Sequence, residues 1–138
     1  MQFYPIHELH DLVENFELLD QNFGFVPAGF HDFDLTVIEF DGKDLFLTLD
    51  LKEHEFSWRA KLKLSNAQIK NLHILPNLSA VGTISEILLS VDGDKLVFVV
   101  SSCIFTGRGD KSYLEVLCDK ITITKAEKVA LWIRNPKY

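Results

Sequence analysis

The sequence contains few of the residues that stabilise a fold from outside its hydrophobic core. Only two of its 138 residues are cysteines, and no Cys-x-x-Cys pair occurs. A disulfide framework or a structural zinc site therefore does not explain the fold. Apolar residues make up 47% of the chain and include eleven phenylalanines, and a chain of this length buries roughly two thirds of its unfolded surface. We expect a single self-sufficient domain over residues 1–138.

Long apolar runs and basic clusters are missing as well. No segment approaches the ~20 apolar residues that cross a bilayer, and the N-terminal sequence MQFYPIHELHDL lacks the basic and apolar regions of a signal peptide. We therefore expect a cytoplasmic protein that does not enter membranes. The net charge is −6 without any stripe of lysine and arginine, which argues against nucleic acid as a partner. An acidic surface favours a basic protein partner, although many cytosolic proteins are equally acidic without one.

No familiar catalytic or cofactor-binding motif is present. Gly107 and Gly109 are not followed by the Gly-Lys-Ser/Thr of a phosphate loop, and no Gly-x-Ser-x-Gly elbow occurs. The tripeptide at residues 108–110, Arg-Gly-Asp, is more simply a turn than an adhesion signal. His7 and His10 are spaced to face one ligand, yet no third metal ligand accompanies them. We expect no enzyme, no cofactor and no metal.

A short helix is expected near the N-terminus. Within residues 5–16, apolar side chains recur at helical spacing, at Ile6, Leu9, Val13 and Phe16. Two glycines and a proline then interrupt regular structure in residues 22–29. This second segment is expected to lead the chain from the helix into a sheet.

Alternating apolar residues then predict consecutive antiparallel strands. The Asp41-Gly42 turn joins strands over residues 33–40 and 45–51 into a first hairpin. A third strand over residues 56–64 has one solvent face, which carries Arg59, Lys61 and Lys63. Residues 65–79 are compatible with either a short helix or an irregular connection.

The second half of the chain repeats this pattern and contains a strand that is apolar on both faces. The Asp92-Gly93-Asp94 turn joins strands over residues 84–91 and 95–101, and residues 96–100 are apolar on both faces. That run predicts a central strand covered on each side, by the N-terminal helix or by a second sheet.

In a later strand over residues 113–123, the apolar parity changes between Cys118 and Ile121. This change predicts a β-bulge or bend near Asp119-Lys120. Residues 126–132 are compatible with a helical turn or an edge strand.

The resulting fold class is α+β and β-rich. We expect an antiparallel meander of about six strands with a short N-terminal helix, arranged as a strongly bent sheet or a two-layer sandwich. An exposed edge strand could pair two copies into a homodimer.

The two cysteines are expected to be free. A symmetric hairpin about residues 106–111 places Cys103 opposite Leu114 and Cys118 opposite Val99. The two sulfurs would then lie roughly 13 Å apart along the strand, which is beyond disulfide reach. We predict mostly buried thiols.

Four aspartates at the two hairpin turns are candidates for contacting a partner: Asp41, Asp44, Asp92 and Asp94. Exposed carboxylates can stand in for phosphate in front of a basic cleft. Turns also favour aspartate for backbone hydrogen bonding alone, so either interpretation is open.

His31 and Asp32 form a further candidate pair. An adjacent histidine and aspartate suggest acid–base chemistry, but neighbours on a strand point to opposite faces and would not ordinarily share a proton. We favour a structural role, in which one of the two side chains ties down the loop through backbone hydrogen bonds.

Several of these features together resemble a known group of proteins. The order Phe30-His31-Asp32, then a strand hairpin, then the late strand Leu114-Glu-Val-Leu-Cys-Asp-Lys-Ile-Thr-Ile123 is similar to small bacterial immunity-type proteins and to domains of unknown function associated with polymorphic toxin systems. The resemblance spans about residues 30–123 and implies no catalytic residues. It implies a non-enzymatic protein that binds and neutralises one basic toxin. The alternative is a carrier for a small or lipid-like ligand in a Phe-rich cavity.

Overall fold

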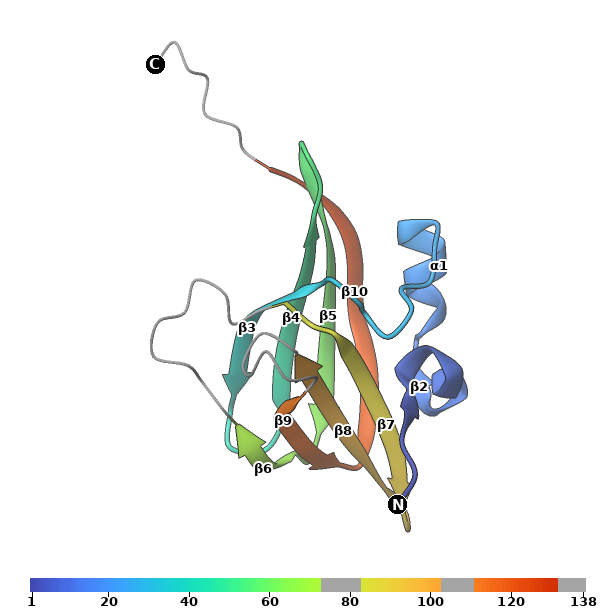
Figure 1. The fold of residues 1–138 in the computed structure, drawn as a ribbon, viewed down its shortest axis with the longest axis vertical. Coiled ribbons are helices and arrows are strands. Elements are labelled where there is room, and N and C mark those ends of the chain that lie inside the picture. Colours follow the sequence, from blue (N-terminus) through green and yellow to red (C-terminus); the bar gives the residue numbers. More distant parts are fainter. Residues whose placement is uncertain (73–82, 103–110, 132–138) are drawn as a thin grey trace.

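The described residues form two five-stranded β-sheets and two short helices (Figure 1). The computed structural model describes residues 1–72, 83–102 and 111–131. We name the sheets after their central strands. The β8 sheet has the order β1-β7-β8-β9-β6, and the β5 sheet has the order β2-β10-β5-β4-β3. The expectation of a β-rich fold is confirmed. Of the two expected arrangements, a strongly bent sheet or a two-layer sandwich, the described residues form two sheets, and they contain ten strands rather than about six.

The strands pair antiparallel except for β2 and β10, which pair in parallel. The β8 sheet contains β1 (Tyr4–Pro5), β6 (Gln68–Leu72), β7 (Glu86–Asp92), β8 (Lys95–Ser102) and β9 (Lys111–Cys118). The β5 sheet contains β2 (Val13–Glu14), β3 (Asp34–Phe40), β4 (Leu45–Lys52), β5 (Phe56–Ser65) and β10 (Lys120–Ala130). Both predicted hairpins are therefore present, as β3–β4 and β7–β8. The simple meander is wrong, because β1, β2 and β6 pair with strands distant in sequence.

The expected single helix over residues 5–16 is wrong, because the chain forms a 3-10 helix and a short strand there and the α-helix begins only at Glu17. A 3-10 helix, η1 (Ile6–Leu12), has a non-helical residue at Leu9. The two residues of β2 then join β10, and α1 (Glu17–Phe23) follows. The apolar spacing was correct for burial, since Ile6 and Phe16 both enter the core. It misidentified the element because pairing with β10 competes with helix formation at this point.

Two long strands pass from one sheet into the other. β5 continues into β6 through Asn66, which has a positive φ of 49°, and β9 continues into β10 through Asp119. The predicted bend near Asp119 is confirmed, and it allows both Cys118 and Ile121 to be buried. Strands that change sheets at such corners are typical of orthogonally packed sandwiches.

The two segments that the sequence left open are strands where they are described. Residues 68–72 form β6, so neither the helix nor the irregular connection expected over residues 65–79 is correct there; residues 73–79 lie outside the described residues. Residues 126–130 belong to β10 and pair with β5 as far as Ala130 opposite Phe56.

One continuous core fills the space between the sheets. The β5 sheet contributes leucines from β4 and β5, and the β8 sheet contributes Ile87, Leu89, Phe98, Val100, Leu114 and Val116. Helix α1 adds Leu19 and Phe23 where it packs against β10. β8 is a central strand, as predicted, and the second sheet covers its inner face.

Candidate functional site

The structure divides the six candidate residues between the two ends of the sandwich. Asp41 and Asp44 follow β3, whereas His31 and Asp32 precede it. Because β3 has seven residues, its ends are about 23 Å apart. The His31–Asp32 pair therefore does not share a site with the turn aspartates.

A network of side chains joins the two hairpin turns. The backbone N–H of Asn66 donates to Asp44 Oδ1 at 3.0 Å, and its side-chain amide donates to Asp119 Oδ2 at 2.6 Å. Lys95, at the start of β8, donates to Asp119 Oδ1. The Lys63 ammonium lies 3.7 Å from Asp44 Oδ2. These contacts bring the β3–β4 and β7–β8 turns to the same end of the molecule.

This network fixes the charge state of Asp119. The hydrogen bond from Lys95, followed by that from Asn66, lowers the pKa of the Asp119 carboxyl. The same ion pair raises the pKa of Lys95. Asp119 is thus held as a carboxylate at the corner where the chain changes sheets.

Asp41 stabilises its own turn. Its Oδ1 accepts hydrogen bonds from the backbone N–H groups of Lys43 at 2.9 Å and Asp44 at 2.7 Å. These two bonds lower the pKa of Asp41. The structural interpretation of this aspartate is therefore correct, although the side chain also remains exposed.

The aspartates at this end fall into two classes. Asp44 and Asp119 are paired with lysines. Asp41, Asp92 and Asp94 are exposed, and within the described part of the chain none of them forms an ion pair. We call these three residues the acidic end. Their carboxylates are available to an external cation.

His31 and Asp32 lie in a turn rather than on a strand. Asp32 has a positive φ of 68°, and His31 Nε2 lies 3.5 Å from Asp32 Oδ1. The expectation that the two side chains point apart is therefore wrong, because it assumed strand geometry. His31 Nδ1 is 2.8 Å from the carbonyl oxygen of Ser85, which agrees with the favoured role of securing the loop.

A second histidine secures the same loop. His7 Nδ1 accepts a hydrogen bond from the backbone N–H of Gly29 at 3.0 Å. Sequence reasoning considered His7 only with His10, as metal ligands. Among the described residues, no group of three or more His, Cys, Asp or Glu side chains is arranged to hold a metal.

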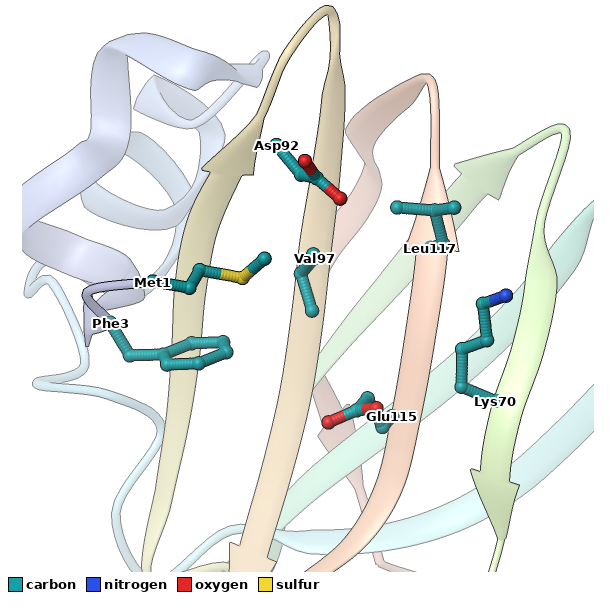
Figure 2. Close-up of a pocket in the computed structure, with 7 residues that line it drawn as sticks. All are labelled: Met1, Phe3, Lys70, Asp92, Val97, Glu115 and Leu117. Carbon is teal, nitrogen blue, oxygen red and sulfur yellow. The ribbon is translucent and has the colours of Figure 1, made fainter.

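Sequence reasoning also missed a groove on the outer face of the β8 sheet (Figure 2). Its volume is about 400 Å³. Val97 and Leu117 form an apolar floor, and Met1 and Phe3 form a wall over β7. The remaining lining residues are charged: Lys70, Asp92 and Glu115.

The strand register explains this floor. Val97 lies opposite Ser90 of β7 and opposite Leu117 of β9, so these residues share a face. Val97 is only 8% exposed although it faces away from the core. The apolar run at residues 96–100 was the sequence signal for a cover on each face. The outer face carries Met1 and Phe3, which precede the segment expected to form the N-terminal helix.

The outer face of the β5 sheet contains a buried charge. Asp50 accepts hydrogen bonds from Arg59 Nε at 2.7 Å and from Thr36 Oγ1 at 2.8 Å, with Ser57 Oγ at 3.4 Å. The bond to Asp50 raises the pKa of Arg59. One of the cations on the third predicted strand is therefore neutralised within the sheet.

The described cysteine is a free, buried thiol. Burial raises the pKa of Cys118 to about 12. Its strand partner is Leu96 rather than the expected Val99, because β8 and β9 begin to pair at Ser102 opposite Lys111 and so are not symmetric about residues 106–111. Cys103 and the Arg108-Gly109-Asp110 tripeptide lie outside the described residues.

Comparison with known proteins gives no independent assignment. Neither helix in the described ranges has the length and apolar character needed to span a membrane. No protein-family model, curated protein or solved structure matches the chain.

Proposed function

We propose that this protein is a non-enzymatic binding module that captures a basic polypeptide at its acidic end. The observation that carries the proposal is the separation of the aspartates into two classes. Asp44 and Asp119 are paired with lysines, whereas Asp41, Asp92 and Asp94 have exposed carboxylates that form no ion pair among the described residues. Asp41 accepts two backbone hydrogen bonds, which leave its charge unpaired.

The fold also holds these carboxylates in a defined arrangement. Both turns are anchored through Asn66 and Asp119, so the acidic end is a pre-organised surface. Pre-organised groups lose less conformational entropy on binding. The net charge of −6 adds a long-range attraction that raises the association rate with a basic partner.

The resemblance to immunity-type proteins suggests the kind of partner. A toxin that acts on nucleic acid has a basic cleft, in which carboxylates can take the place of phosphates. We therefore propose a cytoplasmic protein that neutralises such a toxin by occupying its cleft.

The test is a binding and protection assay with the product of the neighbouring gene. We expect a 1:1 complex, and we expect the chain to protect cells in which that product is toxic. The triple variant D41N/D92N/D94N should bind at least tenfold more weakly. The affinity of the native chain should also fall more steeply with rising salt concentration than the affinity of the variant.

A matched control has the same net charge change elsewhere. Asp20, Glu53 and Glu55 are exposed and remote from the acidic end. The variant D20N/E53Q/E55Q should bind like the native chain. Equal loss in both triple variants, or no complex at all, would contradict the proposed site.

One observation favours the alternative, a carrier for a small ligand. The groove on the β8 sheet has a volume of about 400 Å³, which is in the range of small-molecule sites. The phenylalanines do not favour a cavity where they are described, since Phe30 and Phe33 pack edge to face at 5.1 Å and are buried. Native mass spectrometry of the purified protein would identify a retained small molecule.

A further inference from the structure

The groove and the acidic end share one residue, and this links them into one surface. Asp92 belongs to the β7–β8 turn and also lines the groove. A polypeptide bound at the acidic end would therefore meet the apolar floor of the groove directly. We propose that the groove binds an extended segment of the partner with the pattern basic–x–apolar–x–basic; this inference rests on the proposed function.

The apolar residue of the proposed pattern is inferred from the apolar floor of the groove. Val97 and Leu117 present methyl groups between the two charged ends of the groove, and Met1 and Phe3 close one side (Figure 2). Ser90 Oγ donates to the carbonyl oxygen of Gln2 at 2.7 Å, which holds this N-terminal wall against β7. An aliphatic side chain on the floor would bury apolar surface on two sides.

The spacing of the basic positions follows from the register. Asp92 lies opposite Lys95, and Glu115 lies opposite Val99. The two residues are thus four residues, or about 13 Å, apart along β8. They lie on the two strands that flank β8, about 10 Å apart across the sheet, so their Cα atoms are about 16 Å apart. In an extended peptide, residues i and i+4 are about 13 Å apart and share a face with residue i+2. The flexible side chains of two lysines span the remaining distance when the segment crosses β8 obliquely.

Lys70 limits where on the sheet a basic segment can lie. It forms the wall over β6, on the side opposite Met1 and Phe3. Its register position falls at an irregularity of the β6–β9 pairing, between Ile69 and Asn71. A cation placed against this wall would be repelled, so a basic segment is confined to the line from Asp92 to Glu115.

The test uses a synthetic peptide with blocked termini, Gly-Lys-Thr-Leu-Thr-Lys-Gly, and amide chemical shifts of the full-length protein measured by NMR. We expect shifts at Val97, Glu115 and Leu117. A peptide of the same composition with adjacent lysines, Gly-Lys-Lys-Leu-Thr-Thr-Gly, should bind at least fivefold more weakly. A peptide with glutamate in place of both lysines should not bind.

Two groove variants separate this inference from the proposed function. Glu115→Gln and Leu117→Asn should each weaken the peptide at least fivefold, with unchanged amide shifts remote from the groove as the check on folding. If these variants bind the cognate partner normally while D41N/D94N does not, the groove inference is overturned and the proposed function stands. If the peptide changes only the amide chemical shifts of turn residues, or if the two peptides with different lysine spacing bind equally well, the inference is likewise overturned. A small molecule in the groove in place of the peptide would also overturn it.

Discussion

Replacing Gly29 by alanine should destabilise the fold by an amount that the structure allows us to work out. Gly29 has a positive φ of 63°, and its N–H and carbonyl bond to His7 and Ile87. An L-residue in this conformation costs about 1–2 kcal/mol. An added Cβ would lie 3.0 Å from Glu86 Cγ, and overpacking of this kind typically costs a further ~1–3 kcal/mol.

Gly24→Ala is the matched control for the backbone contribution. Gly24 has a positive φ of 81°, but an added Cβ would have no atom within 4 Å. We expect Gly24→Ala to lower the free energy of unfolding by about 1 kcal/mol, because a stiffer unfolded chain offsets part of the strain. Gly29→Ala should lose about 1–3 kcal/mol more than Gly24→Ala.

The assay is urea unfolding followed by tryptophan fluorescence and circular dichroism, with the midpoint and slope fitted for each variant. Glu86→Ala in the Gly29→Ala background removes the contacted carbon, so the excess loss should largely disappear in a double-mutant cycle. Equal losses for the two glycine variants would refute the reasoning. An excess that persists without the Glu86 side chain would also refute it.

Three further predictions concern buried or paired charges. Arg59→Met should lower the free energy of unfolding by about 1–3 kcal/mol, less than for a fully buried pair because the Arg59 side chain is 32% exposed. A midpoint of thermal unfolding within about 0.5 °C of the native value would contradict this expectation. In a variant whose other cysteine is serine, Cys118 should resist a thiol reagent at pH 8 until urea is added, because burial raises its pKa to about 12. The folded thiol stays protonated while the unfolded thiol ionises from about pH 9, so the free energy of unfolding should fall between pH 9 and pH 12. A free energy of unfolding that does not change over this pH range would be inconsistent with burial of the thiol. The pKa of Asp119 is lowered by its pairing with Lys95, so its stabilising effect should be lost as pH falls below its ordinary pKa, and Lys95→Met should shift the acid-unfolding midpoint to higher pH.

Local sequence patterns were sufficient to predict much of the sheet structure. Asp41-Gly42 and Asp92-Gly93 supply turns whose glycines have positive φ angles of 94° and 64°. The parity change between Cys118 and Ile121 predicted the bend at which the chain changes sheets. These features depend on backbone conformation and on alternate burial, which nearby residues determine.

The N-terminal segment could not be predicted in the same way. Val13 and Glu14 pair with Ile121 and Thr122 of β10, more than a hundred residues later. No local pattern encodes the availability of that strand edge, and the apolar spacing alone therefore suggested a single helix.

The candidate site also combines features that local sequence determines with features that contacts between distant residues determine. Residue type and turn position placed aspartates at the hairpin turns, because aspartate accepts backbone hydrogen bonds there. Only the tertiary structure decided which of them are neutralised, since Asp44 meets Lys63 of β5, whereas Asp41, Asp92 and Asp94 form no ion pair among the described residues. The groove likewise exists only where the N-terminal segment lies against β7. Periodicity in the chain specifies which face a side chain occupies, whereas the charge and shape of a surface depend on contacts between residues far apart in sequence.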